Sequence, residues 1–354
     1  MFPHPRSSAT ALLTLGLALG AVACASPAAA PGQPTAAPAV ASPPARSEPS
    51  PGPAAAGAAA GPRKLRMAIN LNVTAAPVLV AIEKGYFAEA GLELELVPMG
   101  GGAEMVAPLS TGEIDAAAGG ISASLFNAFA RGVDVKIVSD FSRMSRGHGF
   151  GAFLARHDVE LPTLASIRGK RVGFNNPGSP CHYMVGKMLE ANGLTIADVE
   201  TVYLPFNTLP GAFAKREIDA ACAAEPWVAN TLRAGDARLV LTYDELLPDM
   251  QVSVIMISNQ LAAERAVAER FLAAFLRAAP EGKEKLPSTL EAVSRHTGLE
   301  VSVLRETIWT DVDDGGRVNV ESIKDQLDFF TRAGLIQGTV EIDRIVDLSY
   351  LPRR

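Results

Sequence analysis

The chain has 354 residues, of which 48% are hydrophobic and 20% are charged, and its formal net charge is −6. This length allows two domains that each bury a core. A mildly acidic chain without a long run of Lys or Arg excludes nucleic-acid binding through a basic surface.

The first 62 residues predict a leader and a tether. Residues 9–23 form an apolar stretch that is too short to span a bilayer and is typical of a signal-peptide core. The motif AVAC at its end fits either ordinary signal cleavage or lipidation of Cys24. We expect a signal peptide over 1–23, then a lipidated Cys24 and a disordered Ala/Pro-rich tether over 24–62, with the tail of a secreted protein as the alternative.

Strands and helices are then predicted to alternate, separated by short Gly- and Pro-containing turns. The predicted strands cover residues 64–71, 92–97, 116–118 and 135–139, and the predicted helices cover 78–84, 103–110 and 122–130. This alternation is typical of a parallel α/β sheet with helices on both faces.

The same series restarts near residue 171. Its predicted strands cover 171–174 and 199–204, and its predicted helices cover 181–191 and 211–215. The pentapeptide EIDAA occurs once in each series, at 113–117 and at 217–221, each time between a helix and a strand. We interpret it as a structural turn in which Glu and Asp face water and Ile packs inward. Two lobes of the same build are therefore predicted.

Two apolar segments, 150–155 and 252–258, flank the second series and are predicted to cross between the lobes. Lobe one is then expected to comprise residues 63–155 plus 252–354, including C-terminal helices at 262–278, 288–297 and 322–333. Lobe two is expected to comprise residues 156–251.

Several segments, in order, resemble the nitrate/sulfonate/taurine-type substrate-binding proteins of ABC importers, a group that also contains binders of the thiamine pyrimidine precursor. The match covers about residues 64–260 and is carried by EKGYFAEAGLELELVP followed by GGG, GEIDAAAGGISA, GVDVKIV, RGKRVGF with GSPCHY, and EIDAACAAEPW. The resemblance implies the type II periplasmic-binding-protein fold, an α/β fold of two Rossmann-like lobes joined by two hinge strands. Ligand would lie in the cleft between the lobes, which would close on it by hinge bending.

The candidate ligand contacts of lobe one follow from the family pattern, together with the rule that ligands bind beyond the carboxyl ends of strands in open α/β sheets. Asn72 and Thr74 could donate hydrogen bonds to a ligand, although an Asn before a helix is also an ordinary cap. Gly120 allows close backbone approach, and Ser122 begins a helix whose free N–H groups attract anions, unless the turn is only a capped one. The loop 142–148 contains two Arg and one His, and it is either a basic cleft loop or a solvated surface.

The loop 175–183 is the strongest candidate in lobe two. Asn175, Ser179 and the amides of Cys181 and His182 are expected to form an oxyanion-binding helix start. His182 is either a donor to the ligand or a stacked residue of the first helical turn.

Glu225 and Trp227 complete the predicted site. Glu225 could accept from an amine, and Trp227 either stacks on a planar ligand or anchors a helix in the core. Cys181 and Cys222 are expected to be separate buried thiols, although an oxidising compartment permits a disulfide.

The expected function is that of a periplasmic solute-binding lipoprotein that delivers a small anionic or planar organic solute to an ABC importer. Its expected partners are the solute, the membrane permease and the membrane itself through the lipid, with the protein a monomer. We expect no catalytic residues, cofactor or metal, since the chain has no CxxC motif and no metal-spaced His/Cys cluster.

Three alternatives remain. The first is a binder of a pyrimidine precursor or another heterocycle, and the second is a surface sensor or adhesin. The third is an enzyme on the same fold, such as a pyrimidine synthase. The leader and the absence of the CCCFC motif of those synthases argue against it, and Ser179 with His182 suits helix capping better than a catalytic triad.

Overall fold

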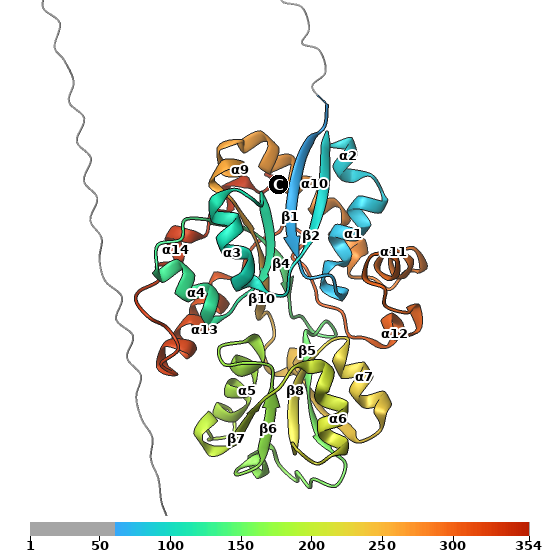
Figure 1. Cartoon of the computed structure of the whole chain (residues 1–354), viewed down its shortest axis with the longest axis vertical. Helices are drawn as coiled ribbons and strands as arrows, with labels where there is room; N and C mark the ends of the chain where they lie inside the picture. Colours follow the sequence, from blue (N-terminus) through green and yellow to red (C-terminus); the bar gives the residue numbers. More distant parts are fainter. Residues whose placement is uncertain (1–60, 354) are drawn as a thin grey trace, which may run out of the picture. The chain divides into compact units, whose positions relative to one another are not determined.

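The computed structural model describes residues 61–353, which contain two separate five-stranded sheets (Figure 1). The predicted leader and Cys24 lie outside the described residues. The first sheet has the order β2-β1-β3-β10-β4, formed by β1 (Arg63–Ile69), β2 (Leu92–Pro98), β3 (Ala116–Gly120), β4 (Lys136–Arg143) and β10 (Gln251–Ile257). The second has the order β7-β6-β8-β5-β9, formed by β5 (Gly151–Arg156), β6 (Arg171–Phe174), β7 (Glu200–Tyr203), β8 (Ala220–Ala224) and β9 (Ala237–Thr242). We call the parts of the chain built on these sheets lobe one and lobe two.

Each sheet contains one strand that runs against its neighbours. In lobe one β1, β2 and β3 are parallel, whereas β10 is antiparallel to β3 and β4. In lobe two β6, β7 and β8 are parallel, whereas β5 is antiparallel to β8 and β9. The reversed strand is in each case the first one after the chain arrives from the other lobe, so the two sheets are built alike.

The crossovers lie a few residues away from their predicted places. β5 is hydrogen-bonded along its length to β8 and β9, so the residues up to 155 that were expected in lobe one belong to the lobe two sheet. The connections are residues 144–150 and 247–250, and they are joined by hydrogen bonds of 3.0 Å from Met144 N to Met250 O and from Asp249 N to Met144 O. A short run of Gly, Ala and Phe suits either sheet, and composition therefore could not assign it.

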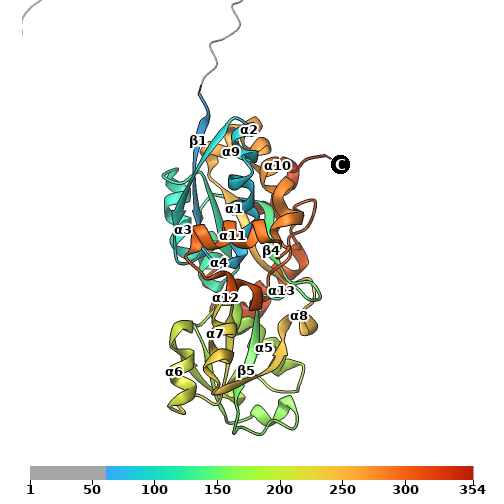
Figure 2. The ribbon, with the colours of Figure 1, turned by 90° about the vertical axis from the view of Figure 1, so that its right-hand side faces the viewer.

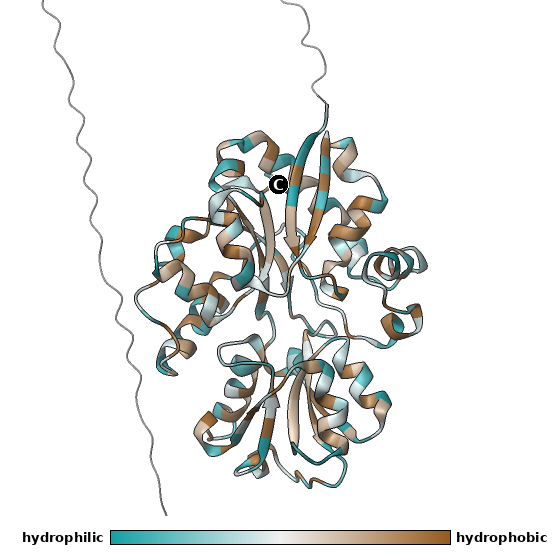
Figure 3. Cartoon of the chain, viewed as in Figure 1, coloured by the Kyte–Doolittle hydropathy of each residue, from teal (hydrophilic) through white to brown (hydrophobic). Residues whose placement is uncertain are grey.

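Helices cover the lobe one sheet, and they come from both ends of the folded part. The main core lies under α1 and α10, where buried Val, Leu, Ala and Phe side chains pack together. Along β2 the sequence LELELVP alternates, which Figure 3 shows as hydrophobic and hydrophilic bands. The lobe one helices are α1 (Ala76–Glu83), α2 (Tyr86–Glu89), α3 (Gly102–Thr111), α4 (Ala123–Ala130), α9 (Asn259–Ala263), α10 (Arg265–Gly282), α11 (Pro287–Thr297), α12 (Val301–Glu306), α13 (Val320–Arg332) and α14 (Ile342–Ile345).

Lobe two has shorter helices around its sheet. They are α5 (Pro180–Glu190), α6 (Leu209–Ala214), α7 (Trp227–Ala234) and α8 (Tyr243–Leu246). No element is predicted for residues 228–250, where the structure places α7, β9 and α8. The five 3-10 turns of the described residues are η1 (Val73–Ala75), η2 (Leu164–Ile167), η3 (Ile196–Asp198), η4 (Phe206–Thr208) and η5 (Leu348–Tyr350).

The repeated EIDAA segment has the same role in both lobes. Ile114 and Ile218 are fully buried, as the pattern predicts. The Asp does not simply face water: Asp115 accepts a hydrogen bond from Arg66 N of β1 at 2.8 Å, and Asp219 accepts one from Arg171 N of β6 at 2.9 Å. Each Asp therefore fixes the start of the next strand to its neighbour in the sheet, which is a structural role.

The C-terminal segment of lobe one also contacts lobe two (Figure 2). There α12 packs against α7, and α13 packs against α5. At the second contact a Cβ on Gly186 of α5 would lie only 2.1 Å from a ring carbon of Phe329 in α13. Only glycine allows the two helices to approach so closely.

Candidate functional site

The loops after the parallel strands of both sheets line one cleft with a volume of about 640 Å³. Eight of the ten residues that the sequence nominates as ligand contacts line it, whereas Cys181 and His182 do not. The eight are Asn72, Thr74, Gly120, Ser122, Asn175, Ser179, Glu225 and Trp227.

The loop after β1 forms a short hydrogen-bonded network on the cleft wall. Asn72 Oδ1 accepts from Thr74 N at 2.8 Å and from Thr74 Oγ1 at 2.6 Å, so Asn72 caps the turn that follows. Its Nδ2 donates to Asn70 Oδ1 at 3.2 Å. Asn72 is therefore the cap considered above, and Asn70, at the start of the same loop, also lines the cleft.

The start of α4 is partly occupied by protein groups. Ser122 Oγ accepts from Leu125 N at 3.3 Å, which is the capped turn considered above. The N–H of Ala123 donates to the carbonyl of Gly178 in lobe two at 2.9 Å. This hydrogen bond joins the two lobes beside the cleft.

The glycines after β2 also line the cleft, and the sequence offered them only as part of a family resemblance. α3 begins close to the end of β3, and a Cβ on Gly102 would lie only 2.9 Å from Gly120 O. No side chain caps this helix start, and Glu104 in its first turn accepts from Gly100 N at 3.0 Å. Glu104 thus adds an exposed carboxylate to the cleft lining.

The start of α5 differs from the predicted oxyanion site. Ser179 Oγ accepts from His182 N at 3.2 Å, and Pro180 has no N–H to offer. The amide N–H of His182, which was expected as a donor to a ligand, is therefore used within the helix start. Asn175 also lines the cleft, and its acceptor atom Oδ1 is buried and has no hydrogen-bond partner among the described residues.

His182 is stacked in the first turn of α5, which is the second of the two alternatives considered above. Its ring is stacked on Phe174 at 5.1 Å and meets the edge of Phe329 at 5.7 Å. Its Nδ1 accepts from Gly178 N at 2.9 Å, and burial lowers the pKa of the imidazole. The stacked ring and its hydrogen bond from Gly178 N fix the loop that precedes α5.

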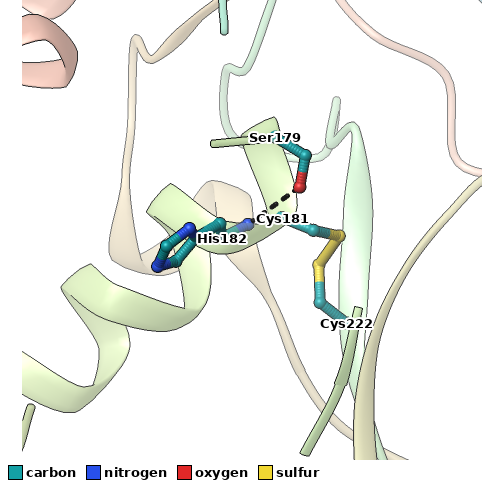
Figure 4. The surroundings of a disulfide bond; sticks show 4 residues. All are labelled: Ser179, Cys181, His182 and Cys222. Carbon is teal, nitrogen blue, oxygen red and sulfur yellow. Dashed lines mark hydrogen bonds between the residues drawn. A yellow bond between two sulfur atoms is a disulfide. The ribbon is translucent and has the colours of Figure 1, made fainter. Parts of the chain in front are cut away.

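Cys181 and Cys222 form a disulfide, contrary to the expectation of two separate thiols (Figure 4). Their Cα atoms are 5.7 Å apart, which is an ordinary spacing for a disulfide. The first turn of α5 packs on β8 and brings together two residues that are 41 positions apart. Since this proximity comes from tertiary packing, sequence spacing did not reveal it.

Glu225 lines the cleft and also joins the lobes. Its Oε1 accepts from Ile308 N of lobe one at 2.9 Å, and its Oε2 accepts from Ala229 N at 3.2 Å. Burial raises the pKa of this carboxyl group, and the two backbone hydrogen bonds partly offset that rise. Both oxygen atoms are thus in use before any ligand is considered.

Polar uncharged residues and apolar residues make up the rest of the lining. Half-buried Trp227 begins α7, and half-buried Phe150 and Phe206 line the same cleft. The only charged side chains in the lining, among residues 61–353, are Glu104 and Glu225.

The basic residues of the loop 142–148, for which a position in the cleft was one of two alternatives, do not line the cleft. Only Ser142 of this loop lines the cleft, where its Oγ lies 2.5 Å from Ser253 Oγ of β10. Arg143 instead forms an ion pair of 3.5 Å with Asp313. A negatively charged ligand would therefore meet hydroxyl, amide and backbone N–H donors in this cleft.

Two further properties concern the described residues only. They contain no group of three or more His, Cys, Asp or Glu side chains placed to hold a metal ion. None of their helices is both long and apolar enough to cross a bilayer.

The chain is similar in sequence to a curated protein. The chain is 23% identical over 205 residues to a protein of Escherichia coli (strain K12) named as an aliphatic sulfonates-binding protein, which covers 57% of this chain and 62% of that protein. The chain thus spans less than two thirds of the length of this curated relative.

Solved structures share the fold. The alkanesulfonate-binding protein SsuA from Xanthomonas axonopodis pv. citri bound to MOPS matches with a TM-score of 0.66 and 22% identity, covering 82% of this chain and 99% of that one. The nitrate-binding protein NrtA from Synechocystis PCC 6803 matches with a TM-score of 0.65 and 16% identity, covering 82% and 87%. The desulfurization enzyme DSZB also shares the fold, with a TM-score of 0.56 and 16% identity over 81% of this chain and 97% of that one.

These similarities confirm the predicted resemblance to sulfonate- and nitrate-binding proteins and the predicted two-lobed α/β fold. Because an enzyme has the same fold, the fold alone does not decide between binding and catalysis. The NMT1-like family model matches residues 58–283, well over half of the chain. The chain belongs to the NMT1-like family.

Proposed function

We propose that this protein is the solute-binding component of an ABC importer and works outside the cytoplasmic membrane. The observation that carries the proposal is one cleft lined by the strand-end loops of two similar sheets. Ligands of open α/β sheets bind at this end of the strands. The sulfonate- and nitrate-binding relatives support the same conclusion.

The proposed solute is a small organic molecule with a polar end and an apolar or planar part. The relatives favour a sulfonate-like oxyanion as the polar end. In this cleft such a group would be held by neutral donors, as anions are at helix starts and backbone amides. Trp227, Phe150 and Phe206 would contact the apolar part.

A planar heterocycle is the second candidate solute, and the charges of the lining favour it. Glu104 and Glu225 repel an anion, whereas the unpaired Oδ1 of Asn175 accepts from an N–H group of a ring or an exocyclic amine. The two solute classes therefore make opposite demands on the same residues.

A thermal-shift screen followed by calorimetric titration tests the proposal. The panel would contain nitrate, ethanesulfonate, taurine, MOPS, benzoate and an aminopyrimidine. A solute present at 100 times its Kd stabilises a protein by about 2.7 kcal/mol, which is a readily measured rise in Tm. If no member of a broad panel raises the Tm, the solute-binding function loses its support.

We also propose that the mature chain is tethered to the membrane as a lipoprotein through Cys24. The apolar leader, the AVAC motif and the Ala/Pro-rich stretch that follows support this proposal. A Cys24→Ser variant is expected to move from the membrane fraction to the soluble periplasmic fraction. Unchanged attachment of the variant would show that the tether is not a lipid on this residue.

Two rival functions have their own tests. An enzyme would consume a panel member, which chromatography of the incubated mixture would detect, whereas a binding protein returns the solute unchanged. A sensor would bind the solute without supporting its uptake. Uptake of labelled solute by cells with and without the gene distinguishes the sensor from the importer component.

A further inference from the structure

Two loops of lobe two line the cleft but are not joined by the sheet. The pairing of β6 with β8 consists of Val172 with Ala220 and Gly173 with Ala221. Beyond that point β6 leads into the loop 175–180, and β8 leads into the loop 224–227. Both loops line the cleft, and no backbone hydrogen bond of the described residues connects one to the other.

The disulfide lies where this pairing ends. Cys222 directly follows the last residue of β8 that pairs with β6, and Cys181 lies in the first turn of α5, two positions after the capping Ser179 (Figure 4). Both cysteines are buried, with 1% or less of their surface exposed. The disulfide thus joins α5 to β8 just beyond the residues at which β6 and β8 are hydrogen-bonded.

Both ends of the disulfide are close in sequence to groups of the cleft wall. On one side Cys181 follows Ser179 and Pro180, which line the cleft. On the other side Cys222 precedes Ala224 and Glu225 in a short, fully buried strand. A change in the distance between the cysteines would therefore change the distance between the loops 175–180 and 224–227.

We propose that the Cys181–Cys222 disulfide is a positioning cross-link of the solute site, which fixes the spacing of the loops 175–180 and 224–227. The proposal rests on the proposed function, because it assigns a role within the same cleft. Loops that are already held in place cost less conformational entropy to order when a ligand binds. The cross-link therefore contributes to solute affinity and not only to the stability of lobe two.

The test separates loop positioning from stability. The double variant C181A/C222A removes the cross-link, and the variant C181V/C222A does the same while restoring side-chain volume should the first fold poorly. Ile167→Ala is the matched control, because Ile167 is fully buried in lobe two but does not line the cleft. Its lost packing lowers stability without removing a covalent link.

Hydrogen exchange gives a readout that needs no ligand. Peptides that cover residues 175–183 and 222–229 are expected to exchange about tenfold faster in the cross-link variants than in Ile167→Ala, because local opening of the loops becomes easier. Peptides that cover the lobe one loop 118–122 should not change. Equal exchange of the lobe two loops in the cross-link variants and the control would overturn the proposal.

Calorimetric titration then uses the panel solute with the largest thermal shift. The cross-link variants are expected to bind it about tenfold more weakly than wild type, while Ile167→Ala binds within about twofold. Wild-type affinity in the cross-link variants would overturn the proposed contribution to binding. If wild type binds no panel member, the proposed function fails, whereas the exchange experiment still decides whether the disulfide holds the loops.

Discussion

Gly178 is where lobe two comes closest to the start of α4, and an added methyl group there should keep the lobes apart. A Cβ on Gly178 would lie 2.5 Å from the Cβ of Ala123 in lobe one. Carbon atoms in contact normally lie about 3.5–4.0 Å apart, so the side chains of Gly178→Ala and Ala123 would overlap by about 1 Å or more. The lobes must then separate at this point, or the hydrogen bond from Ala123 N to Gly178 O must break.

The size of the effect follows from two contributions. Gly178 has a φ of 73°, and an Ala in this left-handed region costs about 1–2 kcal/mol whatever its surroundings. Overpacking adds about 1–3 kcal/mol. Gly193→Ala is the control, because Gly193 has a φ of 69° and a Cβ there would meet no atom within 4 Å. The difference between the two variants isolates the contact between the lobes.

The expected result is that Gly178→Ala and Gly193→Ala lose similar stability within lobe two, while Gly178→Ala alone binds solute more weakly. An interlobe cost of about 1–3 kcal/mol corresponds to a loss of about 5- to 150-fold in affinity. Calorimetric titration measures the affinity, and small-angle scattering without ligand measures the separation of the lobes. Equal affinities of the two variants would refute the reasoning that this contact accompanies binding.

Three further predictions concern the cleft and the buried Asp140. Trp227 lines the cleft, whereas Trp309 is buried in lobe one. Solute binding should therefore change the tryptophan fluorescence of wild type but not that of Trp227→Phe. A fluorescence change in Trp227→Phe would place the solute elsewhere. Glu104→Gln removes a negative charge from the cleft lining, so the variant should bind ethanesulfonate about fivefold more tightly than wild type. The gain in affinity should shrink in high salt, and equal Kd values of variant and wild type in calorimetric titration would contradict the prediction. Burial raises the pKa of Asp140 to about 7, so the folded state holds this proton more tightly than the unfolded state, and the stability that the group contributes falls as pH rises from about 4 to 7. The stability advantage of wild type over Asp140→Asn should therefore fall by roughly 4 kcal/mol over that range in urea unfolding, and a constant difference would show that Asp140 does not titrate there.

Local pattern was enough to predict most elements of the fold. β6 has its predicted bounds, and β2 and α11 differ by one residue, because periodicity and the Gly or Pro at their ends are properties of the segment itself. The assignment of β5 was wrong because strand pairing is decided by distant residues. The six residues of β5 (GAFLAR) carry no information about which sheet accepts the strand.

The site was predictable as a set of loops but not as a set of roles. Strand ends in an α/β sheet meet at one edge, and this rule found eight lining residues. The roles of individual side chains depend on partners far away in the chain, such as Ile308, which lies 83 positions from Glu225. For the same reason the aromatic surroundings of His182 and the disulfide of Cys181 were not visible in the sequence.

The two crossovers give lobe two the form of a single insertion. The chain leaves lobe one after Arg143 and returns at Gln251, and Met144 N lies 3.0 Å from Met250 O. The points at which the chain enters and leaves lobe two are thus joined directly by a hydrogen bond. A single continuous segment of the chain therefore forms the whole lobe two side of the cleft. Exchange of that stretch between relatives would replace the lobe two part of the cleft lining and leave every strand of the first sheet in place.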